Sequence, residues 1–129
     1  MSIFAFVVSV LPQIIPFSAG DEVINAGEVV SFTCTILKGD SPITINWFFN
    51  GTEIESSEDV VISKISKKVS ALTIESARAD HVGEYTCVAK NAAGANNYTT
   101  ILIINGSHLN IFCFGNRFLT LLLPRSYSF

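Results

Sequence analysis

Between residues 22 and 105, several short stretches of this chain alternate apolar and polar residues with a period of two. This period is typical of β-strands with one buried face, because successive side chains point to opposite sides of a sheet. The positions predicted to face the core are Val30, Phe32, Cys34 and Ile36; Ile45, Trp47 and Phe49; Ser70, Leu72 and Ile74; Tyr85, Cys87 and Ala89; and Thr100, Leu102 and Ile104.

Turn residues separate these predicted strands. Asn50-Gly51 is a strong signal for a two-residue hairpin, and Gly94 can take a positive φ at a second hairpin turn. Residues 60–64 are predicted to form a further strand. Residues 12–16 are predicted to form an edge strand, where prolines are tolerated because no ladder N–H is required. The pattern as a whole predicts an all-β fold.

The length of 129 residues allows one domain with about 25–30 residues to spare. A formal net charge of −3 argues against a nucleic-acid partner held by phosphate contacts. The three cysteines form no C-x-x-C pair, and only His81 and His108 could add imidazole ligands. The sequence therefore predicts neither a metal site nor a cofactor.

One eight-residue stretch, residues 80–87, combines a turn with a tyrosine two positions before a cysteine. This is the tyrosine-corner arrangement of immunoglobulin sandwiches. With Cys34 and Trp47 upstream, the chain resembles the I-set of the immunoglobulin superfamily. The residues that carry this resemblance are Cys34, Trp47, Leu72, Asp80, Gly83, Tyr85 and Cys87.

The resemblance implies an immunoglobulin-like, antiparallel Greek-key β-sandwich over residues 12–105. It also implies a disulfide between Cys34 and Cys87 with Trp47 packed on it, which points to an oxidising compartment. The alternative is a pair of buried free thiols, as in the intracellular immunoglobulin domains of muscle. Under either interpretation Cys113 has no assigned role.

Both ends of the chain lie outside the predicted domain. Residues 1–11 are apolar without a basic residue, and are interpreted as a weak signal-like segment or the edge of a gene model. Residues 106–129 form a hydrophobic tail that is too interrupted for a membrane span, and are interpreted as foreign to the domain, as at a mispredicted splice end.

No arrangement of side chains in the sequence predicts catalysis, so we expect no enzyme. Asp80 and His81 are adjacent, but the tyrosine corner explains both, and no serine is spaced with them as in a triad. Asp80 is expected to accept hydrogen bonds at the turn or to pair with a basic residue, for which Lys64 is the candidate. The Tyr85 hydroxyl is expected to bond to the corner backbone.

Three Asn-x-Ser/Thr sequences, at Asn50, Asn97 and Asn105, are candidates for N-glycosylation. By strand parity Asn97 faces outward on the sheet that carries Cys87, and Asn50 lies at the rim of that sheet. Sugars there would hinder close protein pairing. The alternative is that some or all of the sites carry no sugar.

The outward positions of the two sheets differ. The sheet that carries Cys87 presents Phe48, Val88, Ile101 and Ile103, either as an interaction patch or as scattered apolar surface. The opposite sheet is uncharged and free of glycosylation sequences, which suits pairing of identical copies across a two-fold axis. Its predicted binding residues are Ser31, Thr33, Thr35, Val69, Ala71 and Thr73.

Four short stretches resemble the arthropod Down syndrome cell adhesion molecule (Dscam) family, above all its alternatively spliced seventh immunoglobulin domain. They are residues 12–17, Lys38-Gly39-Asp40, Ile45-Asn46-Trp47 and Asn91-Ala92-Ala93-Gly94. This resemblance implies a cell-surface receptor whose domains bind identical copies of themselves in neuronal self-recognition and axon guidance. The expected partner is an identical domain on another chain, with membrane attachment only through the parent receptor. The alternative function is that of a structural domain in an intracellular muscle-type protein.

Overall fold

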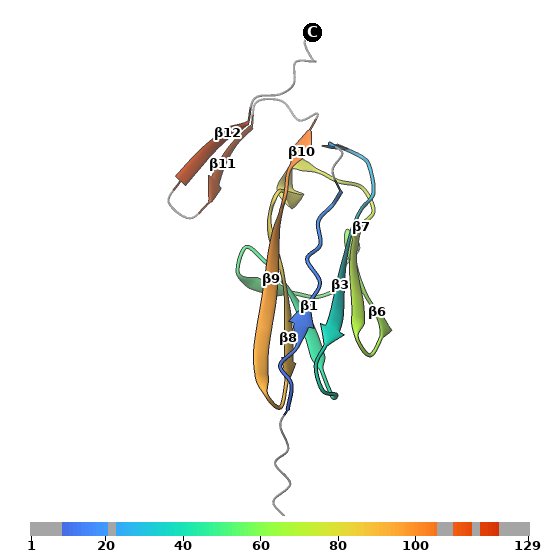
Figure 1. Cartoon of the computed structure of the whole chain (residues 1–129). Coiled ribbons are helices and arrows are strands. Elements are labelled where there is room, and N and C mark those ends of the chain that lie inside the picture. The colour runs from blue at the N-terminus through green and yellow to red at the C-terminus, as the bar shows by residue number, and fades with distance from the viewer. Residues whose placement is uncertain (1–8, 21–22, 106–109, 115–116, 122–129) are drawn as a thin grey trace, which may run out of the picture.

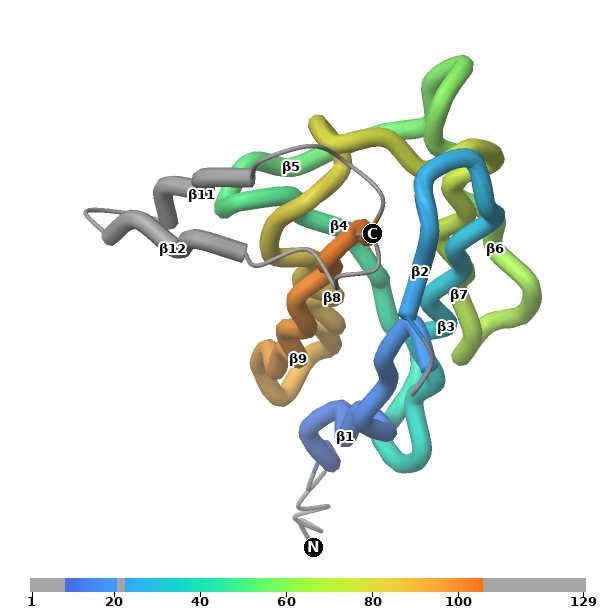
Figure 2. Tube along the Cα trace, turned by 90° about the horizontal axis from the view of Figure 1, so that it is seen from above, coloured from blue at the N-terminus to red at the C-terminus, as the bar shows by residue number. Residues whose placement is uncertain are grey.

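The computed structural model describes residues 9–20, 23–105, 110–114 and 117–121, the last two segments by their backbone. Two four-stranded antiparallel sheets pack face to face as a β-sandwich (Figure 1). Seen along the strands, β5, β4, β8 and β9 lie on one side, and β3, β7 and β6 lie on the other (Figure 2). The predicted all-β sandwich is confirmed.

The first sheet has the strand order β1-β3-β7-β6. Its strands are β1 (Gln13–Ile14), β3 (Val30–Lys38), β7 (Val69–Ile74) and β6 (Val60–Ser66). The predicted alternation is confirmed in β3 and β7, where every second side chain is buried. The strand predicted at residues 60–64 continues to Ser66 through an irregularity after Lys64.

The second sheet has the strand order β5-β4-β8-β9. Its strands are β5 (Thr52–Ile54), β4 (Thr44–Phe49), β8 (Gly83–Asn91) and β9 (Gly94–Leu102). Asn50 (φ 50°) and Gly51 (φ 87°) link β4 to β5, so both central residues have the positive φ of a type I′ hairpin. The hairpin predicted from Asn50-Gly51 is confirmed.

One strand pair was not predicted. β2 (Ile24–Asn25) pairs in parallel with β10 (Ile104–Asn105), in the register Ile24 with Ile104. β1 and β3 both belong to the first sheet. Between them, β2 pairs with β10, which follows β9 of the second sheet. Two residues carry no readable periodicity, so this pairing has no signal in the local sequence.

Hydrogen bonds tie the chain to the sandwich from Val10 onward, two residues before the predicted start. The Val10 N–H donates to Asp40 Oδ2 (2.8 Å), and the Val10 carbonyl accepts from Asp40 N–H (3.2 Å) and from Asn91 Nδ2 (2.6 Å). These bonds join the β3–β4 loop to the β8–β9 turn. Residues 1–8 lie outside the described part of the chain, as does the interpretation placed on them.

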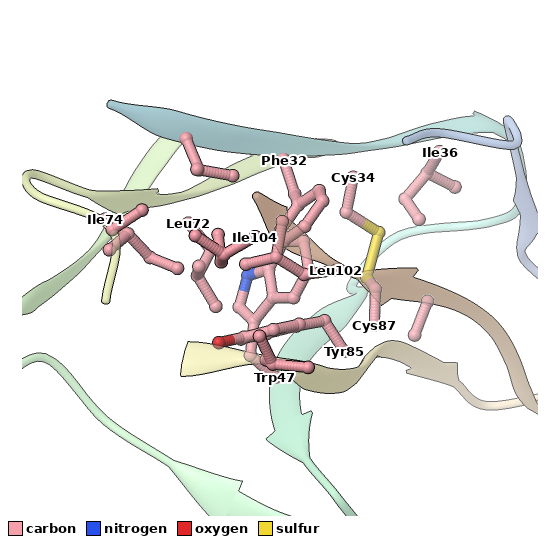
Figure 3. Close-up of a cluster of buried hydrophobic side chains, with 14 residues drawn as sticks. Phe32, Cys34, Ile36, Trp47, Leu72, Ile74, Tyr85, Cys87, Leu102 and Ile104 are labelled. Carbon is pink, nitrogen blue, oxygen red and sulfur yellow. A yellow bond between two sulfur atoms is a disulfide. The ribbon is translucent and has the colours of Figure 1, made fainter. Parts of the chain in front are cut away.

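The core lies between the sheets and contains a disulfide between Cys34 and Cys87 (Figure 3). Trp47, opposite Cys87 in the β4–β8 ladder, is 1% exposed. Its Nε1–H donates to Ser70 Oγ (2.9 Å), and Ser70 is the β-ladder partner of Cys34. The indole thus lies next to the disulfide and bridges the sheets. The bond to Trp47 also explains a serine in the core, because a buried polar group requires a partner.

The segment after the sandwich contains an antiparallel pair of strands, β11 (Asn110–Phe114) and β12 (Arg117–Leu121). Cys113 lies opposite Phe118 in this ladder. The other residues of the predicted tail, 106–109, 115–116 and 122–129, lie outside the described residues.

Candidate protein-interaction site

The outward side chains of β3 and β7 form a regular, uncharged surface, which we call the outer β3–β7 face. Its six residues stand in three cross-strand pairs: Ser31 with Thr73, Thr33 with Ala71, and Thr35 with Val69. The side chains are short, so the surface stays flat, and in one pair Ser31 Oγ and Thr73 Oγ1 share a hydrogen bond (3.4 Å). All six predicted binding residues are therefore brought together on one surface.

The neighbouring strands continue this surface. Val61 and Ser63 of β6 stand opposite Thr73 and Ala71 and share their side of the sheet. Leu37, 56% exposed, follows Thr35 on the outward side of β3. These neighbours are also uncharged, so a partner could approach across three strands without desolvating a charge, which is among the costliest steps in forming an interface.

The other sheet presents a different outer face. Thr86 of β8 and Thr99 of β9 share a hydrogen bond between their hydroxyls (2.7 Å). Asn97, exposed on β9, stands opposite the half-buried Val88 of β8. Asn46 lies beyond Val88 on β4, and its Nδ2 donates to Glu53 Oε2 (2.9 Å). This face therefore combines polar side chains with a charge and a candidate glycosylation site.

The tyrosine corner closes the end of the sandwich where β8 begins. A single turn, η1 (Ala79–His81), precedes β8, and the buried Tyr85 hydroxyl donates to the His81 carbonyl (2.6 Å), as predicted. Burial raises the pKa of this hydroxyl. The buried His81 accepts the Arg78 N–H at Nδ1 (3.0 Å), so it acts as a structural hydrogen-bond acceptor.

The basic partner of Asp80 is Arg78, and the pairing suggested with Lys64 is wrong. Arg78 Nε lies 3.2 Å from Asp80 Oδ1, and Arg78 Nη2 lies 2.9 Å from Asp59 Oδ2. Lys64 is at the far end of β6, opposite Ser70. Hydrogen bonds from Arg78 lower the pKa of both carboxyls, and the two carboxylates raise the pKa of the guanidinium. The group joins the β5–β6 loop to the corner.

This architecture matches a known family over most of its length. The immunoglobulin I-set family model matches residues 13–104. The chain belongs to the immunoglobulin I-set family. No helix in the described part of this I-set protein is long and apolar enough to cross a membrane. Nor do the described residues contain a group of three or more His, Cys, Asp or Glu side chains able to hold a metal ion.

The I-set domain is similar to domains of cell adhesion molecules. It is 37% identical over 99 residues to the cell adhesion molecule Dscam1 of Drosophila melanogaster, covering 76% of this chain and 5% of that protein. Human DSCAM is 38% identical over 80 residues, covering 62% of this chain and 4% of that protein. This chain thus spans a small fraction of the length of these relatives.

Solved structures show the same relationship. The crystal structure of the Dscam1 Ig7 domain, isoform 5, has a TM-score of 0.69 and 42% identity, covering 73% of this chain and 96% of that chain. The I-band fragment I67-I69 from titin has a TM-score of 0.63 and 28% identity, covering 72% of this chain and 32% of that one. The I-set domain therefore shares its fold with both structures, and its identity is higher with the Dscam1 Ig7 domain.

The structure separates the three candidate glycosylation sites of the I-set domain. Asn97 is exposed on a regular strand. Asn50 is exposed, but its Oδ1 accepts the Glu84 N–H (2.9 Å) at the start of β8. Asn105 is half-buried, and its Nδ2 donates to Asn25 Oδ1 (3.1 Å). The amides of Asn50 and Asn105 therefore take part in contacts within the domain.

The contact of Asn50 with the corner was not predicted from the sequence. Asn50 also donates its backbone N–H to the Glu84 carbonyl (2.8 Å), so its backbone and side chain hold the β4–β5 hairpin against β8. Asn-Gly indicated the turn, but the partner lies 34 positions away. A local pattern identifies turn residues and cannot identify the strand that meets their side chains.

Proposed function

We propose that this chain is the recognition module of an extracellular cell-adhesion receptor, which pairs with an identical domain on another chain through the outer β3–β7 face. The observation that carries the proposal is the flat, uncharged surface of six short side chains, in a domain 42% identical to the Dscam1 Ig7 domain. A two-fold axis through such a face brings equivalent pairs together. In a parent receptor, this pairing would serve neuronal self-recognition and axon guidance.

Replacing Ala71→Arg should abolish this pairing. Ala71 lies in the middle pair of the face, so a two-fold interface would bring two arginines close together with no acidic partner on the face. We expect the dissociation constant for self-association of the full chain to rise at least about tenfold. Sedimentation equilibrium measures this directly, and clumping of beads coated with the chain detects weak pairing.

Val88→Arg is the matched control, because Val88 is a half-buried outward residue on the opposite sheet. It adds the same charge to the other face and should leave association intact. Association that survives Ala71→Arg, or that Val88→Arg abolishes equally, contradicts the assignment of the face. A wild-type chain that neither associates in solution nor clumps beads contradicts homophilic pairing.

A structural role inside muscle cells is the second candidate, supported by the similarity to the titin fragment. Two features favour the extracellular role. One is the disulfide, since such bonds persist in oxidising compartments. The other is the exposed sequence Asn97-Tyr98-Thr99 on β9.

Asn97 is expected to carry an N-linked glycan when the chain passes through a secretory pathway. The full chain would be secreted from insect cells behind an added export signal, and its mass compared before and after enzymatic deglycosylation. Asn97→Gln should remove one glycan, while Ser31→Gln on the other sheet should not. An unmodified Asn97 with reduced Cys34 and Cys87 in the native protein would favour the muscle-type role.

A further inference from the structure

The charged side chains of the sandwich are separated by end. One end holds the β3–β4 loop, the β6–β7 turn and the β8–β9 turn, and we call it the basic end. It carries Lys38, Lys64, Lys67, Lys68 and Lys90. The opposite end and its flanks, near the tyrosine corner and the β5–β6 loop, carry Glu28, Glu53, Glu55, Glu58, Asp59, Glu75, Asp80 and Glu84.

Within residues 9–20 and 23–105, each end has one residue of the other sign, and each of these is engaged. Asp40 at the basic end accepts the Val10 N–H, and Arg78 at the acidic end pairs with Asp59 and Asp80. The basic end therefore carries five lysines and one carboxylate, although the formal net charge of the whole chain is −3. The local potential there is opposite in sign to the net charge, and a local potential attracts charged ligands.

The basic end also contains a hollow on the edge between the two sheets. A space of about 360 Å³ is lined by Ser41, Pro42, Ile43, Lys64 and Lys67. A second space of about 330 Å³ shares Ile43, Lys64 and Lys67 with the first and is also lined by residues of β4 and β6. Lys64 and Lys67 are both exposed at the rim. Two exposed lysine side chains thus line a recess that also has a hydroxyl and an apolar wall.

We infer that this hollow binds an anionic group of a sulfated polysaccharide. The lysine ammoniums are point charges suited to sulfate, the Ser41 hydroxyl can donate a hydrogen bond, and Pro42 with Ile43 offers apolar surface to the face of a sugar ring. Two neighbouring recesses at the edge of the sandwich suit a chain with protruding anionic groups, whereas a flat membrane surface would reach only the rim. The site shares with the proposed function only its extracellular location, and it lies away from the outer β3–β7 face.

The test uses heparin as the probe and the full chain as the protein. Lys64→Gln/Lys67→Gln should weaken heparin binding about tenfold, as expected for the loss of two charge contacts at a partly enclosed site. Lys38→Gln/Lys90→Gln is the matched control, because it removes the same charge from exposed positions at the same end. We expect this control to change affinity less than about twofold. Thermal unfolding should be unchanged in both variants because all four side chains are exposed.

Three kinds of outcome would overturn the inference. The first is the absence of heparin binding at physiological salt, or an equal loss in the two double variants. The second is stronger binding to vesicles that contain phosphatidylserine, which would indicate a membrane surface. The third is salt-sensitive self-association that Lys64→Gln/Lys67→Gln abolishes, which would indicate docking of the basic end on the acidic end of another copy. None of these results depends on Ala71→Arg. The failure of polysaccharide binding at the hollow can therefore be distinguished from the failure of pairing through the outer β3–β7 face.

Discussion

Replacing both Cys34 and Cys87 by alanine should lower the free energy of unfolding by about 4 kcal/mol. The disulfide joins residues with a sequence separation of 53, and it removes the conformations that this long loop would otherwise sample in the unfolded chain. Both cysteines are fully buried next to Trp47, so the substitutions also remove packing from the centre of the core. Urea denaturation of the full chain, followed by Trp47 fluorescence, measures the change.

The experiment is best made in a Cys113→Ser background, so that the third cysteine cannot form other bonds. Under reducing conditions the parent and the double variant should approach each other in stability, because the parent then also lacks the cross-link. A double variant as stable as the oxidised parent would contradict the central role of the bond. Such a result would also remove one argument for an oxidising compartment.

Gly83→Ala should destabilise the sandwich by about 3 kcal/mol. Gly83 has a φ of 155°, and a Cβ there would lie 2.6 Å from Asn50 Oδ1 and 2.8 Å from Phe49 Cε1. Neither neighbour can move freely. Asn50 Oδ1 accepts the Glu84 N–H, and the Phe49 ring packs against Tyr85 with centroids 4.8 Å apart. Urea denaturation measures the loss.

Gly27→Ala is the matched control for the backbone contribution. Gly27 also has a positive φ, 90°, but a Cβ there would meet nothing within 4 Å. Its cost should therefore be the backbone strain alone, about 1 kcal/mol. Equal losses in the two variants would show that the close contact at Gly83 adds nothing. They would contradict the view that Asn50 holds the hairpin against the corner.

Much of the core could be predicted because its information is local. The period of two in residues 30–36 and 70–74 requires only neighbouring side chains, and burial follows it in β3 and β7. The spacing of Tyr85 and Cys87 likewise identifies the corner within eight residues. The uncharged composition of the outer β3–β7 face follows from the same alternation, because every outward residue of two strands can be read once one inward residue is known.

Other contacts could not be predicted because their partners are distant in the chain. In the sequence, Ser70 is a polar residue at a core position with no evident partner. In the structure, it accepts the indole N–H of Trp47 from the other sheet. Lys64 was the basic residue suggested for Asp80, but the turn at η1 places Arg78 beside the carboxylate instead. Strand alternation predicted that Asn97 points outward. It could not show that the side chain of Asn105 bonds to that of Asn25, because the two residues meet only when β2 pairs with β10.

The sequence by itself determined the strands of the two main sheets, most of their inward faces, the tyrosine corner and the family. These features depend on spacings within single strands and turns, and covalent geometry sets how side chains alternate there. Only the tertiary structure decided where the charges lie. A formal net charge of −3 indicates a mildly acidic protein, yet antiparallel pairing gathers lysines from three separate connections at one end, most of the carboxylates toward the other, and a hollow beside Lys64 and Lys67. Charges far apart in the chain become neighbours only when the strands that carry them are packed.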